Sequence, residues 1–388
     1  MSISTSQSNS QAQMGAFSRA KELQKKLLFV LFALIVFRLG TFIPIPGIDS
    51  NVFQEIFSQN SGGLLGMFDM FVGGAVQRMS IFALGVMPYI SASIIMSLLT
   101  AVNPTLEQLK KDGGEQGRQK INQYTRYGTV FLATLQGYGL AVGLENMMGP
   151  TGSAVIDPGI FFRLTTVVTI IGGTLFLLWL GEQITQRGVG NGVSLIIFAG
   201  IVANLPAAVA STLELARTGA LSPFFIIILI LFVLLIFTFI VFMERAQRKV
   251  FVQYPKRQVG NKMFGGEASH MPLKLNMSGV IPAIFASSVL LLPLTLSGLS
   301  GGRGPESFNI LSNYLAPGKL LYLILYLSLI MFFCFFYTSI VFNPKETADN
   351  LKKNGGFVPG IRPGEDTANY FDYVITRITV VGALYLGL

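Results

Sequence analysis

The stretch GVMPYISAS, Gly85–Ser93, has a second copy in the chain, GVIPAIFAS at Gly279–Ser287. Six of the nine positions carry the same residue, and both copies lie in long apolar runs. The first copy lies in the second run and the other in the seventh, so the two cross a membrane in opposite directions. Inverted repeats of this kind place a central path at the interface between two halves. A chance likeness between two apolar helices is the alternative.

The apolar runs around these copies define the class of protein. The chain has 388 residues, of which 51% are hydrophobic and only 12% are charged, whereas soluble domains carry about 25% charge. Because no cleavable signal peptide precedes the first run, we expect that run to serve as the targeting signal. Most of the complete runs are long enough to predict membrane-spanning helices, and the shortest are marginal. These runs are Leu27–Ile43, Ile81–Ala101, Tyr127–Leu144, Leu164–Leu180, Val193–Val209, Phe224–Met243, Val280–Leu299 and Leu320–Phe342; a ninth run, Ile375–Leu388, is cut off by the end of the chain.

The lysines and arginines predict the orientation of these spans. Most of the 28 basic residues lie in the N-terminal segment and in alternate loops. The positive-inside rule makes that side cytoplasmic, together with the N-terminus. The net charge of +9 therefore reflects topology and needs no nucleic-acid partner. The basic residues outside this set are Arg38, Arg78, Arg163, Arg217, Arg303 and Lys319.

The interior of the apolar runs carries almost no charge. Coupled transporters place Asp, Glu, Lys or His at mid-depth to bind an ion or proton, and the centres of these runs have essentially none. The expected lining is branched aliphatic residues at helical spacing, which also suit ordinary packing: Val86 with Ile90, and Val193 with Ile197. Pro88 and Pro282 lie within the expected helices and predict a bend or weak point there.

One apolar segment, GGLLGMFDMFVGGA at Gly62–Ala75, is too short to cross. Its 14 residues would cover about 21 Å as a helix, against a hydrocarbon core of about 30 Å. Glycine pairs bracket the segment and Asp69 lies in its middle. The sequence thus predicts half a helix ahead of the second span.

Two loops on the cytoplasmic side are unusually long. Arg245–Lys274 is rich in β-branched and aromatic residues before a Pro-Lys-Arg turn, which predicts a projecting β-hairpin with a basic tip. Asn343–Arg377 predicts a short polar helix, a glycine stop and a proline-stiffened loop that carries Arg362. Both loops suit either solvated linkers or the docking of a large cytosolic partner. No motif for a metal, a cofactor or a nucleophile is present, so we expect no enzyme activity.

Motifs spread over nearly the whole chain resemble the SecY/Sec61-alpha family of channel-forming subunits of the Sec protein translocase. They follow the family order, which makes the likeness highly specific. The matching stretches are FRLGTFIPIPGID, IFALGVMPYISASII, NPTLEQLKKDG, QYTRYGT, WLGEQITQRGVGNGVSLIIFAGIVA, GVIPAIFASS, FNPKETADNLKKNGGFVPGIRPGE and TRITVVGALYL.

The resemblance implies an all-α polytopic membrane protein. Two inverted five-helix halves, with the tenth helix missing from this chain, would form a clamshell around a central pore with a plug helix. The implied parts are a cytoplasmic N-terminal segment at 1–26, an N-terminal half at 27–211, a C-terminal half at 212–388, and large cytoplasmic loops at 244–278 and 343–377.

The resemblance also assigns roles to individual residues. The hydrophobic pore ring falls on Val86, Ile90, Val193, Ile197 and Ile284. The lateral gate between the second and seventh spans falls on Pro88, Tyr89, Ser91, Pro282, Ala283 and Phe285. Docking of a motor or a ribosome falls on Lys256, Arg257 and Arg362. The plug falls on Gly62, Gly63, Leu64, Leu65, Gly66, Met67, Phe68, Asp69, Met70, Phe71, Val72, Gly73 and Gly74.

The implied function is a protein-conducting channel in the bacterial inner membrane. It would translocate unfolded secretory polypeptides and release membrane-protein segments sideways into lipid. The implied partners are SecE and SecG, the SecA ATPase motor, the ribosome, preproteins with signal sequences, YidC, SecDF and anionic phospholipids. A secondary transporter for a small solute is the alternative, and the missing mid-membrane charges count against it.

Overall fold

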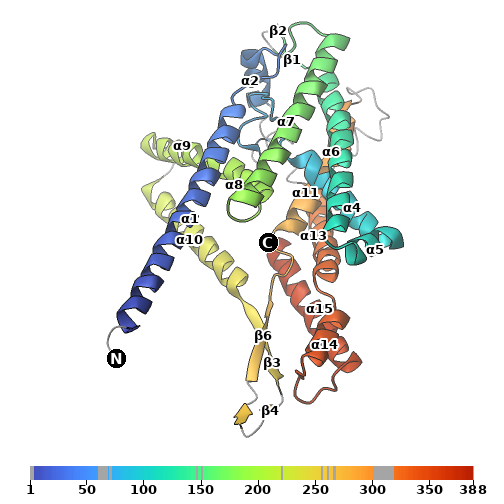
Figure 1. Ribbon diagram of the computed structural model, residues 1–388. Helices are drawn as coiled ribbons and strands as arrows, with labels where there is room; N and C mark the ends of the chain where they lie inside the picture. Colours follow the sequence, from blue (N-terminus) through green and yellow to red (C-terminus); the bar gives the residue numbers. More distant parts are fainter. Residues whose placement is uncertain are drawn as a thin grey trace. The chain divides into compact units, whose positions relative to one another are not determined.

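The computed structural model describes residues 4–59, 69, 72–145, 147–149, 152–219, 222–254, 257–259, 262–264, 268–299 and 319–387. Most of these residues are helical (Figure 1). The chain forms two compact units. The first comprises Met1–Thr212 and Leu291–Pro317, and the second comprises Leu213–Leu290 and Gly318–Leu388.

The first unit is built mainly from helices. Helix α6 packs along α4 and α7, and α7 packs in turn against α1 and α8 (Figure 1). The bounds of its elements, with β1 and β2 paired antiparallel, are α1 Ser4–Gly40, α2 Ser50–Gln59, α4 Met87–Val102, α5 Pro104–Asp112, α6 Gly114–Glu145, β1 Met148–Gly149, β2 Gly152–Ser153, α7 Ile160–Arg187, α8 Gly192–Ala203 and α9 Leu205–Arg217. Residues 213–217 of α9 belong to the second unit.

A buried apolar cluster ties the loops of this unit to the ends of α6 and α7. Its members include Ile45, Phe53, Met79, Val155 and Phe162, each no more than 4% exposed. Burying a side chain of this size contributes about 1.5–3 kcal/mol. Two backbone bridges join the same loops, between Pro44 and Ser80 and between Ile48 and Val155. The cluster therefore fixes the chain on its way into α4.

The composition of the second apolar run predicts one helix over Ile81–Ala101, but the structure does not form a single helix there. Residues 81–86 form turns, and α4 begins only at Met87. Gly85 has φ +54°, which favours glycine because it lacks a Cβ atom. The turn segment approaches α7 at Gly173, where a Cβ atom would lie 2.1 Å from the carbonyl oxygen of Ile81. Apolar composition predicts membrane depth here, but the backbone leaves the helical region.

The second unit combines long helices with a β-hairpin. Helices α13 and α14 both pack against α15. The bounds of its elements are α10 Pro223–Arg245, β3 Gln247–Gln253, β4 Arg257–Val259, β5 Lys262–Phe264, β6 Ala268–Lys274, α11 Ile281–Leu299, α13 Leu320–Val341, α14 Pro344–Lys353 and α15 Glu365–Gly387. Residues 291–299 of α11 belong to the first unit.

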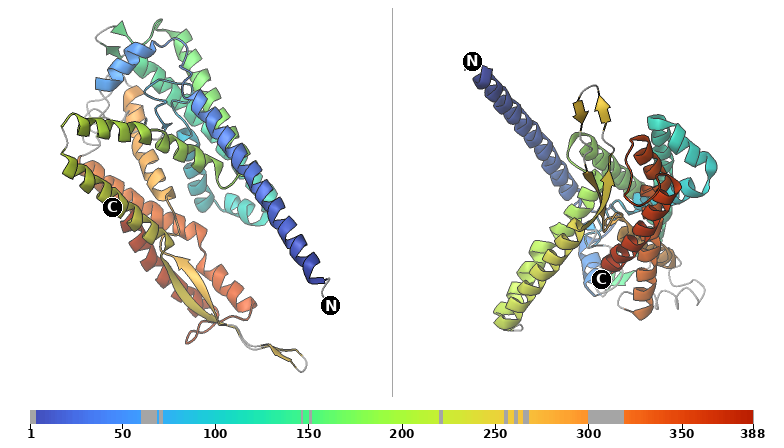
Figure 2. Two further views of the ribbon diagram at one scale, coloured as in Figure 1. Left: turned by 90° about the vertical axis from the view of Figure 1, so that its left-hand side faces the viewer. Right: turned by 90° about the horizontal axis from the view of Figure 1, so that it is seen from below.

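The predicted β-hairpin is confirmed. Strands β3 and β6 pair antiparallel in continuous register from Gln247 opposite Lys274 to Gln253 opposite Ala268. A second short pair, β4 with β5, lies further along the same hairpin. The hairpin continues directly from the C-terminal end of α10, so it projects from that helix (Figure 2).

Three helices extend well beyond the apolar runs that predicted them. Helix α1 includes residues 4–24, which the composition predicts as a polar N-terminal segment, and α6 begins at Gly114 rather than near Tyr127. Helix α15 begins at Glu365, so the loop predicted at 343–377 ends earlier. Hydropathy marks only the apolar part of a helix. It therefore misses the polar residues that continue these helices at their ends. The acidic Glu365 and Asp366 suit the first turn of α15.

The prediction that Pro88 and Pro282 lie inside helices and weaken them is wrong. Each is the second residue of its helix, in α4 and α11 respectively. Proline is well tolerated there because the N–H groups of the first turn have no intrahelical acceptor. These prolines therefore mark where the helices begin.

Length and composition identify four described helices that could cross a membrane, and five if one bent pair is counted as a single span. The bent pair is α4 with α5, which meet at an angle of 103°. Asn103 stands between them and caps α5 by accepting a hydrogen bond from the N–H of Thr105, at 3.0 Å. The chain thus turns sharply at the end of α4.

Candidate pore lining, plug and docking surface

The two copies of the repeat have the same local backbone geometry. Gly85 has φ +54° and Gly279 has φ +60°. In each copy the isoleucine five residues after the glycine donates its N–H to the carbonyl of the repeat's valine, Ile90 to Val86 at 3.1 Å and Ile284 to Val280 at 3.3 Å. Ile90 and Ile284 therefore occupy equivalent positions in the first turns of α4 and α11. This likeness of backbone counts against a chance resemblance between two apolar helices.

The predicted ring residues of the first unit lie at the N-terminal ends of α4 and α8. Val86 and Ile90 are 6% and 7% exposed and lie one turn apart. Val193 and Ile197, half-buried or better, also lie one turn apart at the start of α8. Ile284 belongs to the second unit. That all five residues surround one pore stays a prediction.

The position of Val193 is fixed by a tight corner between α7 and α8. Asn191 caps α8 by accepting hydrogen bonds from the N–H groups of Val193 and Ser194, at 3.1 and 3.3 Å. The N–H of Gly192 donates to Thr185 at 2.8 Å. A Cβ atom on Gly192 would lie 1.9 Å from the carbonyl oxygen of Gly181, so no larger residue fits this corner.

Part of the predicted plug can be placed. Asp69 and Val72 are helical, and Gly73 and Gly74 follow with φ +72° and +84°. A Cβ atom on Gly73 would lie 2.9 Å from the carbonyl oxygen of Gly200 in α8. The C-terminal end of the segment therefore packs closely against the helix that carries Val193 and Ile197. The other predicted plug residues, Gly62–Phe68, Met70 and Phe71, lie outside the described residues.

Charged side chains hold this end of the segment. Arg38 of α1 donates from Nη1 to the carbonyl of Gly73. The guanidinium groups of Arg38 and Arg78 lie on the ring of Phe42, 5.2 and 4.2 Å from its centre. No sequence pattern assigned a role to these residues, although two arginines outside the cytoplasmic set were a signal that could have pointed to them.

Asp69 is the acidic member of the same group. It is 9% exposed and accepts a hydrogen bond from the N–H of Gln77 at 2.8 Å. Burial raises the pKa of the Asp69 carboxyl above its ordinary value, and the backbone N–H groups of Gln77 and Val76 oppose this rise. The carboxylate thus links the segment to the turns that lead into α4.

The predicted gate residues are distributed over the two helix starts. In α4, Pro88 and Ser91 are buried and Tyr89 is half-buried. In α11, Phe285 packs edge-on to Phe333 of α13, with ring centres 5.7 Å apart. Pro282 and Ala283 lie in the same turn of α11. The gate itself would lie between the two units, and it stays a prediction.

The two long loops pack on each other, which no sequence pattern predicted. Gln253 and Phe357 exchange backbone hydrogen bonds of 2.9 and 3.0 Å, which joins β3 to the loop after α14. Val250 and Leu273 of the hairpin share a buried cluster with Ala348, Val358 and Phe371. The alternating apolar residues of β3 and the FVPGI stretch were the available signal, because each needs a partner. We call β3, β6, α14 and residues 354–364 the hairpin–loop body.

The docking residues are described only in part. Arg362 lies on the loop of the hairpin–loop body, and its carbonyl accepts a hydrogen bond from Thr367 at 2.8 Å. Arg257 begins strand β4. Lys256 lies outside the described residues.

Comparisons with known proteins find similar sequences over most of the chain. A family model described as SecY matches residues 80–388. The protein translocase subunit SecY of Escherichia coli (strain K12) is 58% identical over 366 residues, which cover 94% of this chain and 82% of the relative. The protein of the same name from Rickettsia typhi (strain Wilmington) is 56% identical over 369 residues, 95% of this chain and 85% of the relative.

Solved structures share the fold at much lower identity. A structure described as a protein conducting channel has a TM-score of 0.65 at 16% identity and covers 94% of this chain and 84% of its own. Sec61 in the canine ribosome-channel complex from the endoplasmic reticulum has a TM-score of 0.61 at 14% identity, over 94% and 85% of the two chains. These structures show that the chain shares their mostly helical fold.

Proposed function

The chain belongs to the SecY family, and from that membership we propose that it forms the protein-conducting channel of a translocase. It would pass unfolded secretory polypeptides across the membrane and release apolar segments sideways into lipid. The observation that carries this proposal is the 58% identity to a protein translocase subunit over 94% of the chain. The relatives are named as subunits of a translocase and not as transporters of small solutes or as enzymes, so the transporter alternative is set aside.

The character of the ring residues supports this function. Val86, Ile90, Val193, Ile197 and Ile284 are all branched aliphatics at the starts of three helices. Such a ring would hold a passing chain of any sequence without binding it, and its constriction would exclude ions by dewetting. The equivalent positions of Ile90 and Ile284 support a path between two inverted halves.

The short segment Gly62–Gly74 is proposed as the plug of this pore. Each charge that leaks through an open pore dissipates about 2.3 kcal/mol per 100 mV, so a resting channel needs a seal. The attachment of Gly73 to Arg38 and its packing on Gly200 support a segment that is held at its C-terminal end. We propose that release of the contact with Arg38 lets the segment swing aside when a polypeptide enters.

The lateral gate is proposed between the starts of α4 and α11. Pro88, Tyr89 and Ser91 would face Pro282, Ala283 and Phe285. A signal sequence has an apolar core of about 7–15 residues and could intercalate there and partition into lipid. The two halves, proposed at 27–211 and 212–388, would move apart at this seam.

The hairpin–loop body is proposed as the docking site for cytosolic partners. One structural relative is described as part of a ribosome-channel complex, which supports a ribosome as one of them. The SecA motor would use the same surface through Arg362, together with Lys256 and Arg257, which follow β3 in the chain. SecE would brace the halves and SecG would be peripheral, with YidC and SecDF as further partners. The chain would lie in the bacterial inner membrane as a multi-pass protein with its N-terminus in the cytoplasm.

Photo-crosslinking tests the channel directly. A photoreactive residue is placed at Ile90, at Ile197 and, as a control, at Ile230 of α10, which is 56% exposed. A stalled secretory chain is then threaded through the reconstituted complex. We expect strong adducts at Ile90 and Ile197 and none at Ile230. Equal labelling at the three positions, or no labelling at all, would mean that the polypeptide does not pass the proposed ring.

A further inference from the structure

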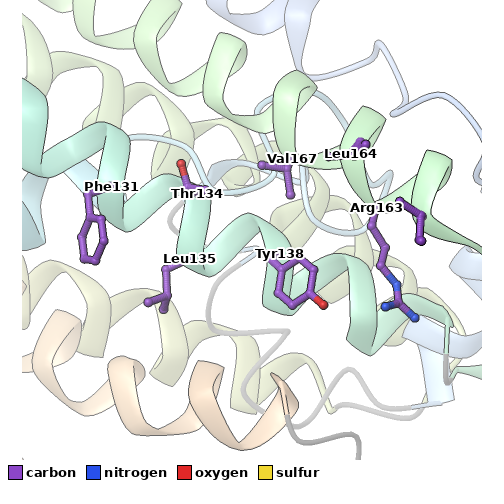
Figure 3. A pocket seen from close by; sticks show the side chains of 8 residues that line it. Phe131, Thr134, Leu135, Tyr138, Arg163, Leu164 and Val167 are labelled. Atoms are coloured by element: carbon purple, nitrogen blue, oxygen red, sulfur yellow. The ribbon is translucent and has the colours of Figure 1, made fainter.

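A groove runs between α6 and α7 of the first unit. It has a volume of about 640 Å³, and its walls are mostly apolar. Phe131, Thr134 and Tyr138 line it from α6, and Arg163, Leu164 and Val167 line it from α7 (Figure 3). The hydroxyl of Thr134 donates to the carbonyl of Val130 at 2.7 Å, so it does not make the wall polar. No role proposed above uses this groove.

The two ends of the groove differ in chemistry. Arg163 and Tyr138 lie next to each other at one end, and Phe131 lies toward the other (Figure 3). Arg163 donates from Nε and Nη2 to Oε2 of Glu145, at 2.9 and 2.6 Å. Glu145 in turn accepts from the N–H of Gly159 at 3.0 Å. The pair holds the guanidinium in place through Nε and Nη2. Tyr138 is a further hydrogen-bond partner of Arg163.

The groove along α6 is short enough to lie within the thickness of one leaflet of a bilayer. Arg163 lies in the first turn of α7, and its partner Glu145 is the last residue of α6. From Tyr138 the groove runs back along α6 to Phe131, about 10 Å by helical rise, and half of a hydrocarbon core is about 15 Å thick. Arg163 is also one of the few basic residues outside the cytoplasmic set. The orientation predicted from the basic residues therefore puts the polar end at the extracytoplasmic interface.

The lining residues favour a lipid chain over a partner helix. Helices that associate inside membranes meet through small residues such as Gly, Ala and Ser. This groove is lined instead by bulky side chains, and several are largely exposed, among them Phe131 at 68% and Leu164 at 60%. A flexible acyl chain fills a channel with such walls, whereas a rigid helix backbone cannot approach them closely.

We propose that the groove seats one phospholipid of the extracytoplasmic leaflet that carries an anionic headgroup. Its phosphate would accept hydrogen bonds from Arg163 and Tyr138, since guanidinium and phosphate form strong charge-assisted bonds. One of its acyl chains would lie along Thr134, Leu164 and Val167 toward Phe131. The site is independent of the passage of a polypeptide, so it stands or falls separately from the channel function.

Photo-labelling with a lipid probe tests the acyl-chain part of the site. The probe is phosphatidylglycerol with a diazirine on one acyl chain, and the protein is reconstituted with its partner subunits in phosphatidylethanolamine vesicles. We expect adducts on peptides that contain residues 131–138 and 160–167. Leu164→Trp, which fills the groove, should reduce the yield of these adducts by about tenfold. That corresponds to a loss of about 1.4 kcal/mol in binding free energy.

A matched control lies one turn further along α7. Val168 is 67% exposed, against 60% for Leu164, but it does not line the groove. Val168→Trp should therefore leave the labelling unchanged, and both variants should retain the thermal stability of the parent. Equal labelling of the two variants would overturn the proposal. Labelling of α10 as strong as that of α6 and α7 would overturn it too, because both results indicate ordinary annular lipid. Labelling that appears only when the partner subunits are removed would show that a protein covers the groove, which would also overturn it.

The headgroup part needs its own variant. Removing Arg163 alone would leave a buried carboxylate unpaired, which is itself destabilising, so the double variant Glu145→Gln with Arg163→Gln is used. Excess unlabelled phosphatidylglycerol should compete with the probe on the parent protein, and inorganic phosphate should not. The double variant should label equally with phosphatidylglycerol and phosphatidylcholine probes. Competition by inorganic phosphate, or an unchanged preference for phosphatidylglycerol in the double variant, would refute the headgroup assignment.

Discussion

Replacing Arg38 by glutamine should make the resting channel leak. Arg38 of α1 donates to the carbonyl of Gly73, at the C-terminal end of the proposed plug. It lies 35 residues before that glycine in sequence, so the contact joins two separate segments. A glutamine side chain at this position would be too short to reach the carbonyl and would carry no charge. The packing of Gly73 on Gly200 would remain, because it involves no side chain of α1.

The size of the effect follows from the kind of bond that is lost. A hydrogen bond from a charged donor contributes about 1.5–3 kcal/mol. Each 1.4 kcal/mol changes an equilibrium about tenfold. If the plug opens by releasing this contact, the open fraction of resting channels should therefore rise by about tenfold to a hundredfold. Arg38→Lys should lie between the glutamine variant and the parent, since it keeps the charge but not the planar fork.

The measurement is the ion conductance of the purified complex in planar bilayers without a translocating chain. Arg217→Gln is the matched control, because Arg217 is also a basic residue outside the cytoplasmic set but lies at the end of α9, away from Gly73 in sequence. Conductance should rise for Arg38→Gln and stay at the parental value for Arg217→Gln. Parental conductance for both, in protein of normal thermal stability, would refute the view that Arg38 holds the segment closed.

Three further predictions concern packing and titration. Gly173→Ala should lower the melting temperature, because its Cβ atom would lie 2.1 Å from the carbonyl oxygen of Ile81, whereas the neighbouring Gly172→Ala meets nothing within 4 Å and should not. Phe371→Ala should cost about 3–5 kcal/mol and expose the hairpin–loop body to limited proteolysis, since Phe371 of α15 is fully buried and shares the apolar cluster of that body, while Leu384→Ala on the same helix, 55% exposed, should be nearly neutral. Burial raises the pKa of Asp69, so the closed plug binds more protons than an open one. Leak should then decrease as the pH falls through the raised pKa toward the ordinary value of Asp, and Asp69→Asn should abolish this dependence; a leak that keeps the same pH profile in Asp69→Asn would contradict it.

Local patterns predicted the regular elements well because each depends on neighbouring residues. The run Phe224–Met243 predicted α10 at Pro223–Arg245, and the β-branched stretch after it predicted the β3–β6 hairpin. The ends of helices were missed where polar residues continue them, as at Glu365. The turn segment at 81–86 was missed for a different reason. Its residues are apolar, and only the contact of Gly173 with Ile81 and the positive φ of Gly85 reveal that the backbone is not helical.

In the candidate site, too, the sequence predicted local features and missed contacts between distant segments. The spacing of Val86 and Ile90 correctly placed them one turn apart, because helical periodicity is local. The contact of Arg38 with Gly73, and the joining of Gln253 to Phe357, connect segments far apart in sequence, and hydropathy does not encode such pairings. The arginines outside the cytoplasmic set and the lone Asp69 in an apolar segment were the local signs that partners were needed, since a buried charge requires compensation.

The repeat shows how a sequence pattern can be right for a reason other than the one first given. The shared proline suggested two weakened helices, yet in both copies it lies in the first turn. What the copies share is a way to begin a helix: a glycine with positive φ, a valine whose carbonyl accepts from the isoleucine four residues on, and a proline that needs no hydrogen bond. Such a start fixes the direction in which the side chains of Ile90 and Ile284 project from their helices. If the two units are related by inversion, keeping this start in each copy is what would allow both isoleucines to enter one ring.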